Sequence, residues 1–164
     1  MVSIWFFHGS TRDNKSCPTA NDLVIKMEAV HQKAVSGDKA SLVKIHEAFG
    51  DYADISGVGE NIQKLKDGKF KMQQAKNANF GGQGYYDPNT GFVELGSAFY
   101  TSSPEMQAGT ILHEASHSIL GTADIFDKNG KPTSRAKPTE PGDKVGCTFS
   151  CFLRRATDSH LLPF

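Results

Sequence analysis

The chain has 164 residues, the length of one domain, and we expect residues 1–164 to fold as a single unit. Its 18 basic and 18 acidic residues give no formal net charge, which argues against a nucleic-acid partner or an anionic membrane partner. The apolar run at residues 4–7 is too short for a signal peptide or a membrane-spanning helix. We therefore expect a globular domain with neither kind of partner.

The first part of the chain is predicted to be helical. Thr19 or Asn21 can cap a helix in which apolar residues recur at helical spacing. A second helix is expected over residues 40–49, ending at Gly50, and a third over residues 58–66.

The middle of the chain has the pattern of a β-hairpin. Residues 77–84 are rich in asparagine and glycine and interrupt regular structure. Tyr85 and Tyr86 then precede the turn sequence Asp-Pro-Asn-Thr at 87–90, and the apolar segment 91–95 follows it. With the helices, this hairpin predicts a mixed α+β fold.

A further helix is expected from Pro104 to Leu120. Ser103 is a suitable N-cap, proline is favoured at the first helical position, and Gly121 is suited to the left-handed conformation just past a helix end. Residues 113–117, His-Glu-Ala-Ser-His, lie inside this helix.

This motif places two histidines on one face of the helix, because residues four apart stack on a 3.6-residue turn. His113 and His117 can therefore direct ring nitrogens at one ion, and Glu114 lies beside them, where it can take a proton from a water. This is the HExxH arrangement of zinc peptidases. The alternative is a helix whose two histidines make ordinary core hydrogen bonds. His31 and His46 belong to no such cluster and are interpreted as packing or surface histidines.

A catalytic zinc site needs a third protein ligand. The metzincin pattern is excluded, because Ala123 occupies the position six residues past His117, where that pattern has histidine. Glu140 lies among prolines and is a poor candidate for a ligand on a following helix. Asp124, just after the glycine turn, is the preferred ligand, and Asp127 is its local competitor.

The motif followed by the sequence Gly-Thr-Ala-Asp at 121–124 resembles the aspzincins, the family of deuterolysin and peptidyl-Lys metalloendopeptidase. The resemblance covers about residues 42–159 and includes the segments 107–112, 85–88 and 93–95 and the helix end at Phe49 and Gly50. It implies a zincin-like fold, mainly helical with a small antiparallel sheet or hairpin beside the active-site helix. It also implies that His113, His117 and Asp124 bind Zn²⁺ and that Glu114 is the general base.

The chain departs from the family pattern at the position of a tyrosine that is thought to steady the oxyanion. Asp127 stands there, and a carboxylate cannot donate a hydrogen bond unless it is protonated. Other donors are needed if turnover is to be efficient. The candidates are Tyr100, Arg154, Arg155 and His160.

A second departure concerns specificity. Asp158 matches the first of two family acids that draw a lysine side chain into the substrate pocket, but Leu161 replaces the second. The resemblance therefore implies a lysine preference after the scissile bond that rests on Asp158 alone. The alternative for Asp158 is a solvated turn residue near the terminus.

The sequence thus predicts a zinc metalloendopeptidase that acts on polypeptides. One alternative is a zinc amidase or endopeptidase toxin that cleaves peptidoglycan peptides, and another is a zinc-binding protein weakened in catalysis by the missing tyrosine. The compartment stays open between secretion and delivery as an effector. The sequence fixes neither the oligomeric state nor the redox state of Cys17, Cys147 and Cys151.

Overall fold

The structure is a computed structural model that describes residues 16–77 and 79–124. These residues form a mixed α+β fold, which confirms the predicted class. The elements in chain order are α1 (Ser16–Val35), α2 (Lys39–Phe49), α3 (Ile55–Asp67), β1 (Lys71–Gln74), β2 (Gly84–Asp87), β3 (Phe92–Leu95), α4 (Ser97–Thr101) and α5 (Pro104–Leu120).

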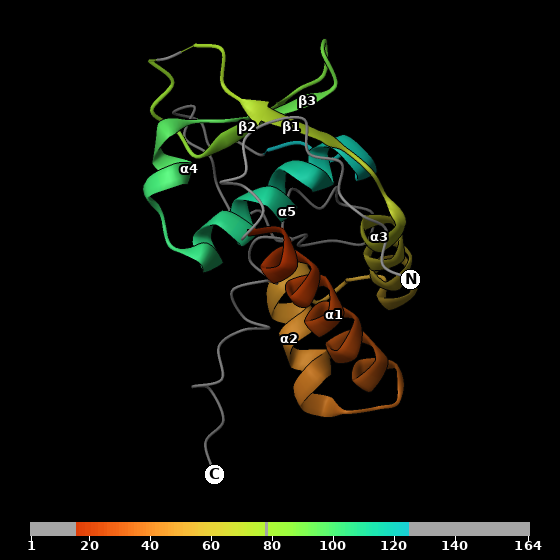
Figure 1. Ribbon diagram of the computed structural model, residues 1–164. Coiled ribbons are helices and arrows are strands. Elements are labelled where there is room, and N and C mark those ends of the chain that lie inside the picture. Colours follow the sequence, from red (N-terminus) through yellow and green to blue (C-terminus); the bar gives the residue numbers. More distant parts are fainter. Residues whose placement is uncertain (1–15, 78, 125–164) are drawn as a thin grey trace.

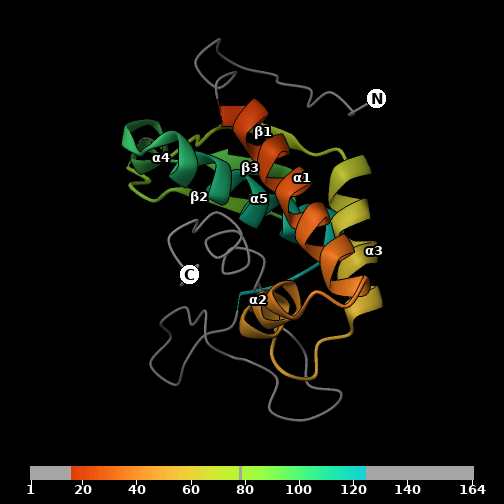
Figure 2. The same ribbon diagram turned by 90° about the horizontal axis from the view of Figure 1, so that it is seen from below.

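Helix α5 lies at the centre of the described part of the chain. It packs on β2 and β3 on one side and on α1 and α3 on the other, while α2 packs on α1 (Figures 1 and 2). Side chains from both layers meet along α5 and are withdrawn from water, which is the main driving force for packing. The largest fully buried hydrophobic side chains of the described part are Phe99, Met27, Ile45, Ile62, Leu65, Leu95, Ile111, Leu112 and Val93.

The sheet has three strands in the order β1-β3-β2 among the described residues. The β2–β3 hairpin is antiparallel, as predicted, and pairs Tyr85 with Glu94. Strand β1 was not predicted, and it pairs with β3 in parallel. The expected small antiparallel sheet is therefore a mixed one, with β2 at one edge.

Local signals at both ends of α5 explain its bounds, which are those expected. The hydroxyl of Ser103 accepts a hydrogen bond from the Met106 N–H at 3.3 Å, and proline fills the first turn, where its missing N–H is not needed. Gly121 has φ 66° and ψ 26°, and its N–H donates to the Ser116 carbonyl. The chain therefore turns back directly after the helix.

Two other helices begin earlier than predicted. Helix α1 continues through Thr19 and Asn21 and begins at Ser16, so neither residue is its cap. Helix α3 begins at Ile55 because Asp54 caps it, accepting the Ser56 N–H at 3.1 Å. The end of α2 is as expected, with the Gly50 N–H donating to the His46 carbonyl.

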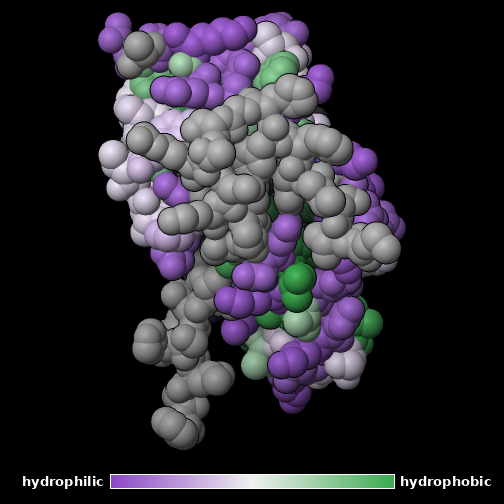
Figure 3. All heavy atoms as spheres, in the orientation of Figure 1, coloured by the Kyte–Doolittle hydropathy of each residue, from purple (hydrophilic) through white to green (hydrophobic). Residues whose placement is uncertain are grey.

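Hydrophilic side chains dominate the coloured surface around the sheet in Figure 3, and hydrophobic ones lie singly over α1 and α2. Isolated exposed hydrophobic residues are normal on a protein surface. The exposed large ones among the described residues are Ile25, Val35, Val43, Tyr52, Tyr85 and Met106. No helix in the described ranges is both long enough and apolar enough to cross a membrane.

Candidate metal centre

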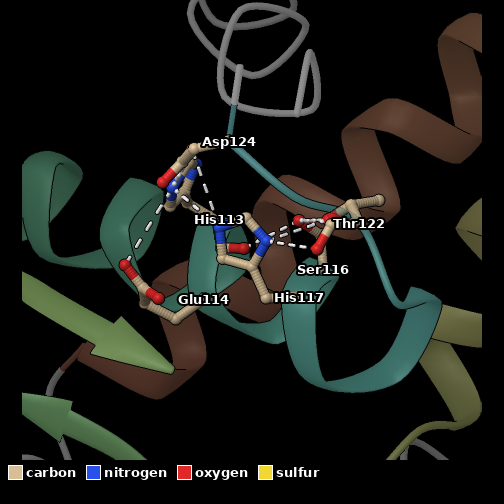
Figure 4. A network of polar contacts seen from close by, with 6 residues as sticks. All are labelled: His113, Glu114, Ser116, His117, Thr122 and Asp124. Carbon is tan, nitrogen blue, oxygen red and sulfur yellow. Dashed lines mark hydrogen bonds and ion pairs between the residues drawn. The ribbon is translucent and has the colours of Figure 1, made fainter. Parts of the chain in front are cut away.

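The two histidines of the motif face each other one turn apart on α5. Their rings are nearly perpendicular, with centroids 4.7 Å apart, and their Nε2 atoms are separated by 3.2 Å (Figure 4). This proximity follows from the i, i+4 spacing, since both side chains leave the same face of the helix.

Asp124 joins them from the segment that follows α5. The left-handed turn at Gly121 sends the chain back along the helix, so that Asp124 Oδ1 lies 3.3 Å from His113 Nε2 and 3.7 Å from His117 Nε2. One atom from each of these three side chains lies within 4.8 Å of the others, and in the described residues they form the group of side chains that could hold a metal ion. The side chain of Asp124 is 39% exposed, against 25% for His113 and 10% for His117.

These separations suit a tetrahedral zinc ion. Zinc binds histidine nitrogen and carboxylate oxygen at about 2.0–2.2 Å, so two ligands of a tetrahedral site lie about 3.3 Å apart. The observed distances of 3.2, 3.3 and 3.7 Å between the three ligand atoms are close to this value. Two imidazoles and one carboxylate also form a donor set that catalytic zinc uses, with a fourth position left for water or substrate.

The positions of the protons on the two histidine rings favour a bound cation at this cluster. Burial, and then the neighbouring His117, lower the pKa of His113, while Asp124 raises it, so the ring is neutral near pH 7. His117 Nδ1 lies 2.8 Å from the Thr122 carbonyl, which can only accept, so Nδ1 carries the proton. The lone pair on His117 Nε2 then faces the Asp124 carboxylate, an arrangement that needs a cation or a proton between the two atoms.

Glu114 lies next to this cluster and is only 5% exposed. Its Oε1 is 4.0 Å from His113 Nε2. Burial and then the charge of Asp124 raise the pKa of Glu114 to about 7, against a lowering by the hydrogen bond from the Tyr86 N–H. A carboxyl group with a pKa near neutrality can both accept and return a proton at physiological pH.

The edge of β2 that faces away from β3, unpaired among the described strands, runs beside Glu114. Because the Gly96 N–H donates to the Gln83 carbonyl at 3.0 Å, the register of the hairpin turns the main-chain groups of Gly84 and Tyr86 away from β3. Gly84 lets the strand approach the helix closely, since a Cβ there would lie 3.2 Å from Thr110 Cγ2. Main-chain groups that β3 does not use therefore line one side of the site, and one of them, the Tyr86 N–H, donates to Glu114.

The structure brings together four of the five predicted site residues: His113, Glu114, His117 and Asp124. The fifth, Asp158, lies outside the described residues, as do Asp127, Glu140, Arg154, Arg155, His160 and Leu161. Tyr100 lies on α4 with its ring packed edge-on against Phe99 at 5.3 Å.

The two other histidines in the described residues, His31 and His46, hydrogen-bond to backbone carbonyls, in agreement with their interpretation as packing or surface residues. His31 Nε2 lies 2.8 Å from the Ile55 carbonyl, and His46 Nδ1 lies 3.2 Å from the Gly50 carbonyl. Sequence reasoning missed the contacts that Ser116 and Thr122 make with the histidines. The one signal in the sequence was a hydroxyl residue on each side of the helix end.

Comparisons of this chain with protein-family models, curated proteins and solved structures give no significant match. We therefore infer its function from the site.

Proposed function

We propose that the protein is a zinc-dependent endopeptidase in which His113, His117 and Asp124 hold the metal. The observation that carries this proposal is the convergence of their three ligand atoms at separations of 3.2–3.7 Å. The order of residues, HExxH followed by Gly-Thr-x-Asp, supports a place among the aspzincins and a zincin-like fold.

Glu114 is proposed as the general base. Zinc bound at the cluster would polarise a carbonyl group and allow water to attack at neutral pH. Glu114 takes the proton of the attacking water and passes it to the nitrogen of the leaving amine. Its burial and its pKa of about 7 in the absence of metal suit this exchange, and a cation nearby would lower that pKa by favouring the carboxylate.

The geometry of β2 supports a polypeptide substrate in extended conformation. Such a chain can add to the edge that β3 leaves free by hydrogen bonds with the main chain of Gly84 and with the Tyr86 carbonyl, and a peptide bond would then lie beside Glu114. Main-chain pairing makes little demand on sequence. A preference for lysine through Asp158 stays a prediction.

Cleavage of a denatured protein mixture, followed by mass spectrometry, tests the proposal. We expect the zinc-loaded protein to cut many peptide bonds, a chelator to stop cleavage and added zinc to restore it. His117→Ala should abolish cleavage, whereas the matched variant His46→Ala should retain it, since His46 bonds only a helix-end carbonyl among the described residues.

Other outcomes separate the alternatives. Cleavage of purified cell-wall peptides without cleavage of proteins would replace the endopeptidase by a peptidoglycan hydrolase. Bound zinc with no cleavage of either substrate would indicate a zinc-binding protein that has lost catalysis. A chain that binds no zinc would contradict the proposal itself.

A further inference from the structure

The segment that carries Asp124 is tied back to α5 by two hydroxyl groups. Ser116, fully buried near the end of the helix, donates its hydroxyl proton to the His113 carbonyl at 2.7 Å. The Ser116 and Thr122 hydroxyl oxygens lie 2.9 Å apart, across the turn made by Gly121 (Figure 4). We call this pair of side chains the hydroxyl clasp.

The protons in the hydroxyl clasp have one consistent direction. Because Ser116 uses its proton on a carbonyl, the proton between the two hydroxyls is that of Thr122. The oxygen of Thr122 then presents lone pairs to His117 Nδ1 at 3.2 Å, and the Thr122 carbonyl lies 2.8 Å from the same atom. Thr122 therefore offers only acceptors to Nδ1 and holds the proton of His117 there.

This arrangement acts on two metal ligands at once. With its proton on Nδ1, His117 keeps the Nε2 lone pair for the metal. Thr122 also precedes Asp124 by only two residues, so fixing Thr122 fixes the start of the segment that brings the carboxylate in. Asp124 itself is 39% exposed, and burial alone does not fix its position.

We propose that Ser116 and Thr122 are positioning residues of the metal centre, which orient His117 and hold Asp124 within reach of the ion. The inference rests on the proposed function and deepens it. Neither hydroxyl is among the ligand atoms, so the effect is exerted through the ligands they hold. In metal sites, loss of a partner that orients a ligand typically costs 10-fold to 100-fold in affinity.

The dissociation constant for zinc, measured by competition with a chromogenic chelator, tests this inference. Thr122→Val and Ser116→Ala should each raise it by about 10-fold to 100-fold. The double variant should bind zinc about as tightly as the single variant with the lower affinity, because either change alone breaks the hydroxyl clasp. Thr122→Ser keeps the hydroxyl, so its dissociation constant for zinc should stay within about 3-fold of that of the unchanged protein. This change is clearly smaller than the increases of about 10-fold to 100-fold expected for Thr122→Val and Ser116→Ala.

Ser118→Ala is the matched control, since Ser118 lies on the same helix and has no side-chain hydrogen bond in the described residues. Cobalt titration adds a readout of ligand geometry: the absorption spectrum of bound Co²⁺ should change in the clasp variants and stay unchanged in Ser118→Ala. Ser116→Ala adds no atom and places a strong helix former in α5, so it should fold even if Thr122→Val does not.

The results separate this inference from the proposed function. Zinc binding by the unchanged protein with equal affinity in Ser116→Ala and Thr122→Val would overturn the inference alone. An equal loss in Ser118→Ala would also overturn it, because the effect would then be one of the helix in general. No zinc binding by the unchanged protein would overturn the proposed function and the inference together.

Discussion

Glu94 and Glu114 are two almost inaccessible carboxyl groups with opposite chemistry. Glu94 is 4% exposed and Glu114 is 5% exposed, yet the pKa of Glu94 is lowered and that of Glu114 is raised to about 7. The two lie on neighbouring elements, β3 and α5. Their accessibility therefore does not explain the difference.

The supply of hydrogen bonds explains it. Burial is the largest single effect on Glu94 and raises its pKa, but its three hydrogen bonds, together with the charge of Lys76, outweigh it. Its oxygens accept from the Tyr85 hydroxyl at 2.9 Å, the Gln73 amide at 3.0 Å and the Lys76 N–H at 3.3 Å. Glu114 has one backbone donor, from Tyr86, against deeper burial and the charge of Asp124. Glu94, whose carboxylate accepts several hydrogen bonds, stabilises the sheet. Glu114, which accepts few, can exchange a proton near neutral pH.

The largest expected contrast is in catalysis. Glu114→Gln should reduce turnover by about 100-fold to 10,000-fold while keeping zinc, because the amide fills the same space but cannot accept the proton. Glu94→Gln should leave turnover of the folded, zinc-loaded protein nearly unchanged. Peptide hydrolysis at saturating substrate, with zinc content measured in parallel, checks both. Equal losses of turnover in Glu114→Gln and Glu94→Gln would contradict the different roles assigned to the two carboxyl groups.

Zinc binding should separate Asp124 from Asp127. Asp124→Ala removes a proposed ligand and should weaken zinc affinity by more than about 100-fold, the upper range for a group that only orients a ligand. Asp127→Ala should retain zinc. Chelator competition on both variants measures the difference, and the opposite order would assign the third ligand to Asp127.

The pH dependence of stability should differ between the metal-free protein and Glu114→Gln. The pKa of Glu114 rises from 4.5 in the unfolded chain to about 7 in the folded one, so the folded state binds the proton more tightly. Its contribution is fully present below pH 4.5 and is lost as pH rises to about 7. The difference in free energy of unfolding between the two proteins should change by on the order of 3 kcal/mol across this window.

Urea unfolding of the chelated proteins at several pH values measures this difference. A difference that does not vary between pH 4.5 and 7 would mean that Glu114 keeps an ordinary pKa. Glu94 should act in the opposite sense: its lowered pKa stabilises the fold above the unfolded value, and this contribution is lost as pH falls through the folded pKa.

The smallest expected effect is the loss of stability in Glu94→Gln. Oε2 accepts from both Tyr85 and Lys76, and Oε1 accepts from Gln73, so in either orientation the amide NH₂ faces a donor on one side, which costs about 1–3 kcal/mol in free energy of unfolding. Glu105→Gln, at an exposed position in the first turn of α5, should change stability much less. Unfolding curves for the two variants at pH 7 would refute the structural role of Glu94 if they coincided.

The sequence predicted α5 and its motif well because their signals are local. Ser103, Pro104 and Gly121 mark the ends of the helix by their own backbone and capping chemistry, and the histidine spacing needs no information from elsewhere in the chain. Asp124 was also within reach of local reasoning, since it follows the turn by only three residues.

The features that the sequence did not predict depend on distant partners. Strand β1 consists of Lys-Met-Gln-Gln, without the β-branched residues that favour strands, and is stabilised by parallel pairing with β3 about twenty residues away. The donors to Glu94 come from two separate segments, residues 73–76 and Tyr85, so its lowered pKa is a property of the assembled sheet. The contact between Tyr86 and Glu114 likewise exists only once β2 packs on α5.

X-ray absorption at the zinc edge of the purified, zinc-loaded protein tests the central claim most directly. The account predicts about one zinc per chain, bound by two imidazole nitrogens and one carboxylate oxygen with about 2.0–2.2 Å bonds and one further light-atom ligand. In Asp124→Ala the protein carboxylate should be lost from the spectrum. Sulfur ligands, a single imidazole, or an unchanged spectrum in Asp124→Ala would contradict the claim that His113, His117 and Asp124 form the zinc site.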